Sequence, residues 1–429
     1  MDVQHRQFVR ADAGAWHDAA ASAIDVTIVM PCLNEIQSLP HCIGNALDAL
    51  ARLRADHGLH GEIVVADNGS TDGSQALATA LGARVVPIAQ RGYGAALIGG
   101  CHAAAGRHIL MGDCDGSYDF TQGVAMVARL EQGFDLCMGS RFKGGIAKGA
   151  MPWKNRHIGN PALTGLLNLF FRSGISDAHC GLRAIRRDAF VRLGLTGSGM
   201  EFASEMVIKA ALLKLRITEL PATLSPDLRQ RAPHLRPWRD GWRHLRYLFM
   251  LSPTWVFGVP GVLAVVLAAI LLGAAALETA LPGTAPAIGT YWTVLGGGLL
   301  TIGHLALLMV CAGHLFAMHR GYRLAGRGSA IIARFANLET LLAAGAVALL
   351  AGAGLLGLVA WEWVARDFGK AASIFLPVAG TSLVIVGLQT IMSAFLMAMI
   401  SGNEAQFIPA RPVPAPQPAI AIVPERLAA

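Results

Sequence analysis

Charged residues are scarce in this chain of 429 residues. Asp, Glu, Lys and Arg together make up 15% of the sequence, hydrophobic residues make up 54%, and the mean hydropathy is +0.48. So little charge excludes an ordinary soluble protein, and membrane-spanning segments are expected. The formal net charge is still +7, and residues 229–246 hold six arginines and one acid. Next to a membrane segment, such a basic patch favours anionic lipid or a phosphorylated substrate as its ligand.

Cysteine pairs and a secretory signal are also lacking. The seven cysteines form no CxxC pair, which argues against a disulfide scaffold or a zinc site and suits a reducing compartment. Residues 1–23 are polar and Ala-rich without an apolar core, so we expect a flexible N-terminal segment and no secretory signal. No RNA- or DNA-binding motif accompanies the basic patch, which disfavours a nucleic-acid partner.

Strand-like and helix-like patterns alternate along the first half of the chain. Residues 24–35 form an apolar, β-rich run, and residues 38–56 carry leucines and an isoleucine at helical spacing. Further strand-like runs occupy residues 62–73, 83–88, 107–113 and 135–140. This alternation predicts a doubly wound, mostly parallel α/β sheet, in which ligands bind at the carboxyl ends of the strands.

Four long apolar segments follow, each long enough to cross a bilayer. They cover residues 254–277, 290–317, 338–360 and 374–400. We predict an all-α transmembrane domain over 252–402 and a flexible Pro/Ala-rich tail over 403–429. The loop at 319–337 carries four arginines and no acid, so the positive-inside rule places it in the cytoplasm. Four crossings then put the N-terminal domain and the C-terminus on the cytoplasmic side of the inner membrane.

Residues 235–251, between the two halves, have the pattern of an amphipathic helix. Large apolar side chains share one face, and arginines form a stripe beside it. The apolar face comprises Trp238, Trp242, Leu245 and Phe249, and the stripe comprises Arg239, Arg243 and Arg246. We predict an interfacial helix with its apolar face in lipid and its basic stripe toward phosphate headgroups. The alternative is a core-packing helix with a solvated basic side.

Acidic residues cluster at the end of one strand-like run. Asp113, Asp115 and Asp119 follow the apolar residues 109–111. In an extended segment alternate side chains point the same way, so Asp113 and Asp115 can face one cation. Mg²⁺ and Mn²⁺ prefer such hard oxygen ligands, with phosphates and waters completing the coordination. The spacing predicts a metal and diphosphate site. A solvated turn is the alternative, and Asp119 is favoured as a helix cap.

The acidic pair belongs to a series of five motifs. They are PCLNE (31–35), DNGSTDG (67–73), RGYG (91–94), DCDGSYDF (113–120) and GSRF (139–142). In this order the motifs resemble the inverting glycosyltransferases of family 2, and the resemblance implies a GT-A-type fold over residues 24–234. Two later stretches, 176–190 and 199–210, are similar to the branch that contains dolichyl-phosphate mannose synthase and bacterial polyprenyl-phosphate glycosyltransferases.

The resemblance also implies roles for individual residues. The nucleotide sugar would be bound by Pro31, Leu33, Glu35, Asp67, Asp113 and Asp115. A Mg²⁺ or Mn²⁺ ion would be held by Asp113, Asp115 and Ser117. The acceptor phosphate would be contacted by Arg141, Arg183, Arg229 and Arg231. Arg141 and the two aspartates would be the catalytic residues, and the sugar would contact Glu201 and Glu205.

Several of these residues also have a purely structural interpretation. Arg141 and Arg183 could pair with neighbouring acids. Glu201 and Glu205 are four residues apart and could form the solvated or capping face of one helix. Asn68 stands where the family usually has a second acid, which leaves the contacts to the nucleoside base open.

The sequence thus predicts a membrane-bound, metal-dependent glycosyltransferase. It would transfer a hexose, with inversion, from a nucleotide sugar of the GDP-mannose or UDP-glucose type. The acceptor would be a polyprenyl or dolichyl phosphate at the cytoplasmic face of the membrane. The membrane helices could also mediate a homo-oligomer.

Three other functions are weighed against this one. A processive polysaccharide synthase usually carries a QxxRW motif, which is absent here because Gln230 is followed by Arg-Ala-Pro. A sugar nucleotidyltransferase should have a Gly-rich phosphate loop straight after its first strand, and MPCLNE is not such a loop. A non-catalytic scaffold or lipid transporter would have no need of Asp113, Asp115 and Arg141, which are all present.

Overall fold

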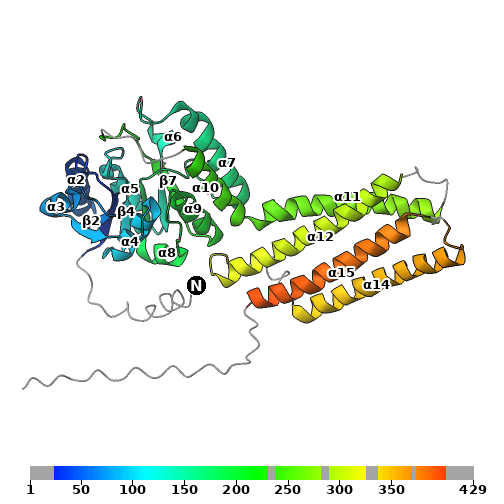
Figure 1. Cartoon of the computed structure of the whole chain (residues 1–429). Helices are drawn as coiled ribbons and strands as arrows, with labels where there is room; N and C mark the ends of the chain where they lie inside the picture. The colour runs from blue at the N-terminus through cyan, green and yellow to red at the C-terminus, as the bar shows by residue number, and fades with distance from the viewer. Residues whose placement is uncertain (1–23, 230–236, 282–288, 325–336, 370–372, 402–429) are drawn as a thin grey trace, which may run out of the picture.

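The computed structural model describes residues 24–229, 237–281, 289–324, 337–369 and 373–401 (Figure 1). It shows a compact α/β domain followed by a bundle of long helices. The predictions for residues 1–23, residues 403–429 and Arg231, and for most of the arginine-rich loop at 319–337, lie outside the described residues.

The domain is built on a sheet of seven strands. They are β1 (Val26–Cys32), β2 (Gly61–Asp67), β3 (Arg84–Pro87), β4 (His108–Met111), β5 (Leu136–Ser140), β6 (Arg183–Arg186) and β7 (Ile217–Pro221). Their order across the sheet is β3-β2-β1-β4-β6-β5-β7. Only β6 runs antiparallel to its neighbours among these strands, so the prediction of a mostly parallel sheet is confirmed. The five strands expected from the sequence are all present, whereas β6 and β7 were not predicted.

Helices cover both faces of this sheet, as Figure 1 shows. They are α2 (Leu39–His57), α3 (Ser74–Ala80), α4 (Tyr93–Ala103), α5 (Gly123–Glu131), α6 (Arg141–Gly144), α7 (Asn160–Phe171), α8 (Arg187–Leu193) and α9 (Phe202–Leu212). Successive residues of a strand point to opposite faces, so β1 contributes to two cores. Ile28 packs in one core with Leu39 of α2, and Val29 packs in the other with Leu97 of α4. Both faces of the sheet are therefore covered by apolar side chains, and the polar groups lie at the strand ends.

The helix α10 (Pro237–Met250) lies between the domain and the bundle in the chain and connects them. It packs against α7 and α9 of the domain. His244 and Leu248 are buried in that contact, and the ring of Phe249 lies 6.0 Å from that of Phe170. The first membrane helix begins only a few residues after α10 ends, with a π-helical turn at Thr254–Gly258.

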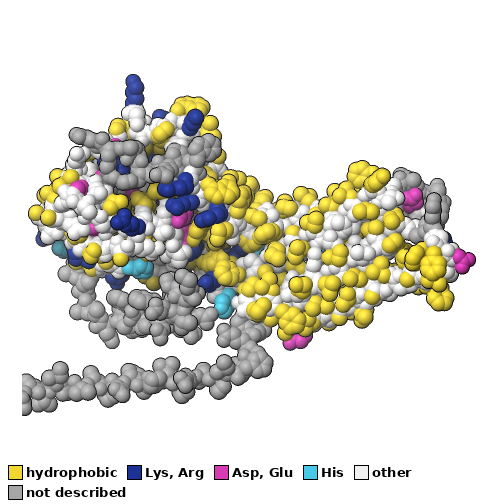
Figure 2. Space-filling view, in the orientation of Figure 1, with side chains coloured by type: hydrophobic (Ala, Val, Ile, Leu, Met, Phe, Trp, Pro, Cys, Tyr) yellow, Lys and Arg dark blue, Asp and Glu magenta, His cyan; other side chains and the backbone are white. Residues whose placement is uncertain are grey.

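Four helices of the described chain are long and apolar enough to span a membrane. They are α11 (Val259–Ala280, extended by the preceding turn), α12 (Thr290–His319), α14 (Leu338–Ala365) and α15 (Phe375–Ile400). In Figure 1, α11 leads away from the domain and α12 returns toward it, and α14 and α15 repeat this path. Hydrophobic side chains dominate the visible surface of the bundle in Figure 2. The predicted region of four membrane helices is confirmed.

Candidate active site

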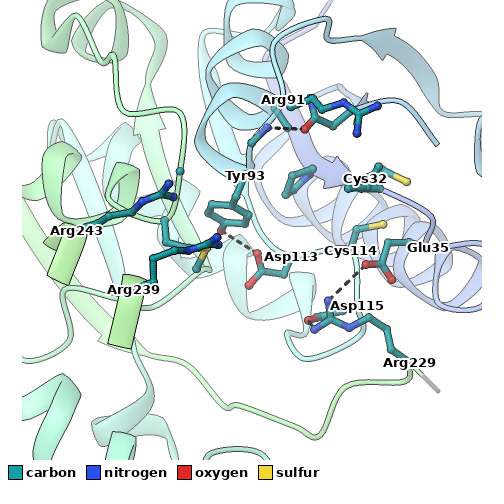
Figure 3. A pocket seen from close by; sticks show the side chains of 17 residues that line it. Cys32, Glu35, Arg91, Tyr93, Asp113, Cys114, Asp115, Arg229, Arg239 and Arg243 are labelled. Atoms are coloured by element: carbon teal, nitrogen blue, oxygen red, sulfur yellow. Dashed lines mark hydrogen bonds and ion pairs between the residues drawn. The ribbon is translucent and has the colours of Figure 1, made fainter. Parts of the chain in front are cut away.

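A cleft of about 540 Å³ opens at the carboxyl ends of β1, β2 and β4 (Figure 3). It is formed where the loops after these strands meet the start of α4 and one side of α10. The residues that line it include Pro31, Leu33, Glu35, Asn68, Arg91, Tyr93, Asp113, Asp115, Met200, Arg229, Arg239 and Arg243. Parallel strands bring these segments together because their carboxyl ends meet at one edge of the sheet.

Asp113 and Asp115 lie in this cleft, just beyond the end of β4. The hydroxyl of Tyr93 donates a hydrogen bond of 2.8 Å to Oδ1 of Asp113. Burial and the nearby charge of Asp115 raise the pKa of the Asp113 carboxyl to about 6, although Tyr93, Arg183 and Arg229 act against that rise. Two neighbouring carboxylates, one of them with a raised pKa, form a site where a cation is favourable.

Arg229 places a positive charge among the acids of the cleft. Its guanidinium lies 2.7 Å from Asp115, 3.1 Å from Asp227 and 3.4 Å from Glu35. The main chain before it is held against the acidic turn, because the amide of Leu228 donates to the carbonyl of Asp115 at 2.9 Å. Arg229, one of the four arginines predicted to contact the acceptor phosphate, is therefore bound to carboxylates in this structure.

Ser117 lies beside Asp115 and bonds to it. Its hydroxyl and its amide both donate to Oδ1 of Asp115, at 2.5 and 3.0 Å. No group of three or more His, Cys, Asp or Glu side chains in a metal-holding arrangement occurs among the residues that the structure describes. The predicted role of Ser117 as a third metal ligand therefore stays a prediction. Asp119 caps the short helix that follows it by accepting from the amide of Thr121, which confirms the predicted cap.

Residues of the PCLNE motif line the cleft, whereas the first residue of the DNGSTDG motif lies behind it. Pro31, Leu33 and Glu35 line the cleft. Asp67 is buried and not among the lining residues. Its carboxylate accepts from the amides of Gly69 and Ser70 in the turn that follows it, and from the side chain of Gln75 on α3 at 2.6 Å. A direct contact of Asp67 with the nucleoside base stays a prediction.

The residue after Asp67 holds the RGYG loop in place. The amide nitrogen of Asn68 donates to the carbonyls of Ile88 and Gln90, and its oxygen accepts from the amide of Gly92 at 2.7 Å. Gly92 has a φ of 135°, and a Cβ there would lie 2.1 Å from the carbonyl oxygen of Ser198. The loop is thus a tight turn that only glycine fits, and it presents Arg91 and Tyr93 to the cleft.

Arg141 and Arg183 are buried and already bonded. The guanidinium of Arg141 donates two hydrogen bonds of 2.7 Å to the carboxylate of Asp177, which is fully buried. Arg183 donates to the main-chain carbonyls of Cys180 and Ala203. Neither arginine is among the residues that line the cleft. Their predicted contacts with the acceptor phosphate stay predictions, and the structural interpretation of Arg141 as half of an ion pair is the one observed.

The two glutamates behind the cleft differ in role. Glu205 is fully buried, pairs with Lys209 at 2.7 Å and accepts from the amide of Gly197 at 2.7 Å. Burial alone would raise the pKa of Glu205, but Lys209 and these hydrogen bonds hold that pKa below its ordinary value. Glu201 accepts from the amide of Gly199, and its other carboxylate oxygen is buried without a hydrogen-bond partner. The predicted sugar contacts of both glutamates stay predictions.

Three arginines and a tyrosine that line the cleft were not predicted as site residues. Arg91 and Tyr93 belong to the RGYG motif, so a signal was present, but the motif alone did not show which side chains face a ligand. Arg239 and Arg243 belong to the predicted stripe of α10. We expected that stripe to face lipid headgroups, whereas two of its arginines line the cleft (Figure 3). The third, Arg246, is exposed and not among the lining residues.

Comparison with known proteins agrees with this architecture. Residues 27–194 match the model for glycosyl transferase family 2, and residues 310–401 match that for the family 2 C-terminal transmembrane region. The low-salt glycan biosynthesis hexosyltransferase Agl6 of Haloferax volcanii is 35% identical over 381 residues, which cover 87% of this chain and 89% of that protein. The chain therefore belongs to glycosyltransferase family 2, and it is a membrane glycosyltransferase.

Two further similarities cover the catalytic domain. The dolichyl-phosphate hexose transferase of Haloferax volcanii is 29% identical over 199 residues, which cover 46% of this chain and 81% of that protein. The crystal structure of glucosyl-3-phosphoglycerate synthase from Mycobacterium tuberculosis is 21% identical, covers 55% of this chain and 84% of that chain, and superposes with a TM-score of 0.39.

Proposed function

We propose that this enzyme transfers a hexose from a nucleotide sugar to a polyprenyl or dolichyl phosphate, with inversion, at the cytoplasmic face of the membrane. The observation that carries the proposal is the position of the cleft. It has an acidic pair, Asp113 and Asp115, near one side, and on the other a helix that leads directly into the first membrane span. The similarity to a dolichyl-phosphate hexose transferase supports a lipid phosphate as the acceptor.

The cleft residues fit a divalent cation. The Arg229 guanidinium already lies among the carboxylates of Glu35, Asp115 and Asp227, so this corner of the cleft accepts positive charge. Burial and Asp115 raise the pKa of Asp113, and a bound cation would stabilise its carboxylate as an anion. Asp113 and Asp115 would hold Mg²⁺ or Mn²⁺, which would offset the negative charge of the leaving diphosphate.

A phosphate acceptor does not require a strong general base from the protein. A phosphate monoester is an anion near neutral pH, so its oxygen can attack without a strong general base. Among the described residues that line the cleft, none is a histidine, which is compatible with such an acceptor. The task of the chain is then to hold the acceptor in line with the sugar and to stabilise charge on the leaving group. Pro31, Leu33 and Glu35, which line the cleft, would hold the nucleoside.

The proposed orientation rests on which parts share one end of the bundle. The catalytic domain and the end of α12 lie at the same end in Figure 1. The ammonium of Lys209 in the domain lies 5.8 Å from the centre of the Tyr322 ring, just after α12. Arg320 and Arg323 belong to this arginine-rich loop, which the positive-inside rule puts in the cytoplasm.

The test is a donor and acceptor screen with the full-length protein in lipid nanodiscs. Labelled GDP-mannose and UDP-glucose are each supplied with a prenyl phosphate and Mg²⁺ or Mn²⁺, and organic-phase label is measured. We expect one donor to give a lipid-linked monosaccharide that disappears on treatment with a chelator. A long polymer would instead show a processive synthase. No turnover with a wide donor panel would show a non-catalytic protein, and full activity after chelation would remove the metal from the proposal.

A further inference from the structure

Two arginines of α10 face the reaction cleft from the side opposite Arg229. Arg239 and Arg243 line the same cleft as the acidic pair. Figure 3 shows them beside Tyr93 and Asp113, whereas Glu35, Asp115 and Arg229 lie at the other end. The two arginines are four residues apart on one helix and therefore share a face. The cleft has an acidic end suited to a cation and a basic end suited to an anion.

The basic end is rigidly held, because α10 is packed into the domain. The ring of His244 is buried, and its Nδ1 lies 2.8 Å from the hydroxyl of Ser204 on α9. Leu248, four residues further, is fully buried. Such a helix presents its arginines at fixed positions, which lowers the entropy cost of binding an anion between them.

The surroundings of Arg243 show that its guanidinium points inward. A Cβ added to Gly199 would lie 2.8 Å from Nη1 of Arg243 and 2.5 Å from a carboxylate oxygen of Glu201. Gly199 itself lines the cleft. Gly199 thus leaves room for the guanidinium of Arg243 beside the carboxylate of Glu201.

The helix that carries the basic end leads into the first candidate membrane span. Helix α10 ends at Met250, and the first span begins at Thr254. A phosphate carried on a prenyl chain has its tail in the bilayer, so it must enter the cleft from this side. The family-derived candidate for that phosphate, Arg141, is instead bound to Asp177 in the interior.

We propose that Arg239 and Arg243 together bind the phosphate of the lipid acceptor and hold it in the cleft. Guanidinium groups suit this role because each can donate two parallel hydrogen bonds to phosphate oxygens. The inference rests on the proposed function, since it names the acceptor subsite of that same reaction. It differs from the expectation that the stripe of α10 contacts bulk headgroups, because only Arg246 of the stripe lies outside the cleft.

The first experiment measures binding without turnover. Full-length protein in detergent is titrated with a water-soluble, short-chain prenyl phosphate, and with the matching prenyl alcohol as a control. We expect Arg239→Ala and Arg243→Ala each to weaken binding of the phosphate by about tenfold or more, and Arg246→Ala to leave it within about twofold. Arg243→Lys keeps the positive charge but loses the paired donors of the guanidinium. Its affinity for the phosphate should therefore lie between those of wild type and Arg243→Ala. Equal binding of the phosphate by wild type and both alanine variants would overturn the subsite.

The second experiment separates this subsite from the donor site. Affinity for the nucleotide sugar with Mn²⁺ is measured on the same variants, and kinetic constants are measured in nanodiscs. We expect a raised KM for the lipid acceptor and a donor affinity within about twofold of wild type. A matching loss of donor affinity would assign the arginines to the diphosphate and overturn the inference. If wild type binds the prenyl phosphate through these arginines but forms no lipid-linked sugar, the proposed function fails while the subsite stands.

Discussion

The catalytic domain keeps its large apolar side chains inside, whereas the membrane bundle exposes many of its own. In the domain, large residues such as Ile28, Leu110 and Phe120 are fully buried. In the bundle, Leu263 is 65% exposed and Val347 is 67% exposed. Water drives apolar area inward in the domain, whereas lipid tails solvate a leucine as well as a neighbouring helix would. The two halves of one chain therefore need different cores.

Glycine forms the seam of the bundle where α14 meets α15. A Cβ on Gly345 would lie 2.9 Å from the carbonyl oxygen of Gly387, and one on Gly352 would lie 2.7 Å from that of Gly380. The helices touch backbone to backbone at these two levels. Close approach increases van der Waals contact between the helices, which replaces the hydrophobic drive that is missing in lipid.

Polar groups inside the two regions also differ. The domain buries full charges in pairs, such as Arg141 with Asp177. The bundle uses neutral pairs, such as Nε2 of His304 with the hydroxyl of Thr390 at 2.9 Å, which joins α12 to α15. The domain can keep the Arg141–Asp177 pair buried because the two side chains are closely hydrogen-bonded. Substitutions in either region can test this contrast.

Breaking the buried ion pair of the domain should have the largest effect. Arg141→Ala leaves the fully buried Asp177 carboxylate without its cation, so we expect the free energy of unfolding of the domain to fall by about 3–5 kcal/mol. Denaturant unfolding followed by near-UV circular dichroism measures this. Replacing both residues, as Arg141→Met with Asp177→Leu, should recover part of the loss. Unchanged stability together with a raised KM for the lipid acceptor would instead return Arg141 to the acceptor site.

Removing one acid of the cleft should act on chemistry and spare the fold. We expect Asp115→Asn to lower the rate of transfer by at least about 100-fold, because the diphosphate would lose much of its counter-charge. The unfolding midpoint should stay close to that of wild type, since Asp115 lies in the cleft. Mn²⁺ binding by the variant, followed by electron paramagnetic resonance, should weaken in parallel. Near-normal transfer by Asp115→Asn would contradict the proposed metal site.

Inserting bulk into the glycine seam should break the bundle and leave the cleft intact. A Cβ at Gly387 would lie 2.6 Å from the amide of Leu349, so we expect Gly387→Leu to cost about 1–3 kcal/mol of stability. Gly357→Leu is the matched control, because nothing lies within 4 Å of a Cβ there. Thermal unfolding in detergent and nucleotide binding are measured on both. Equal stability of the two variants would show that the seam does not hold the helices together.

Lowering the pH should reduce the stability of the domain, because the folded state disfavours protonation of the buried His179. Burial lowers the pKa of His179 well below its ordinary value, and His244, Arg141 and Arg183 lower it further. Below about pH 6.5 the unfolded chain therefore binds a proton that the folded domain rejects. Stability from this group is full above that pH and falls by up to ~1.4 kcal/mol per pH unit as the pH drops. His179→Gln should flatten this dependence, and an unchanged slope in that variant would assign it to other groups.

The sequence predicted the parts of the fold that have strong local patterns. Five strands and four membrane helices follow from long apolar runs or clear alternation. The strand β6 escaped prediction because RAIR is short and has an arginine at each end. Pairing with β4 on one side and β5 on the other makes it a strand. Such pairing depends on segments far apart in the chain, which local patterns do not encode.

The candidate site was predictable to a similar degree. Asp113, Asp115 and Glu35 line the cleft, as their positions after predicted strands led us to expect. The sequence could not show that Arg141 points inward to Asp177, because the two residues are 36 positions apart. Nor could it tell which side of α10 faces the protein, since the helix has an apolar face and a basic stripe that both suit an interface.

The sequence alone was enough to predict which segments span the membrane, which alternate as strands and helices, and where the acidic pair stands. These properties depend on hydropathy and on spacing along the chain, and both are local. The three-dimensional fold selects which charged groups neutralise one another and which face the cleft. That choice depends on burial and on distances between residues remote in sequence, and it places Arg141 in the core and Arg239 and Arg243 in the cleft.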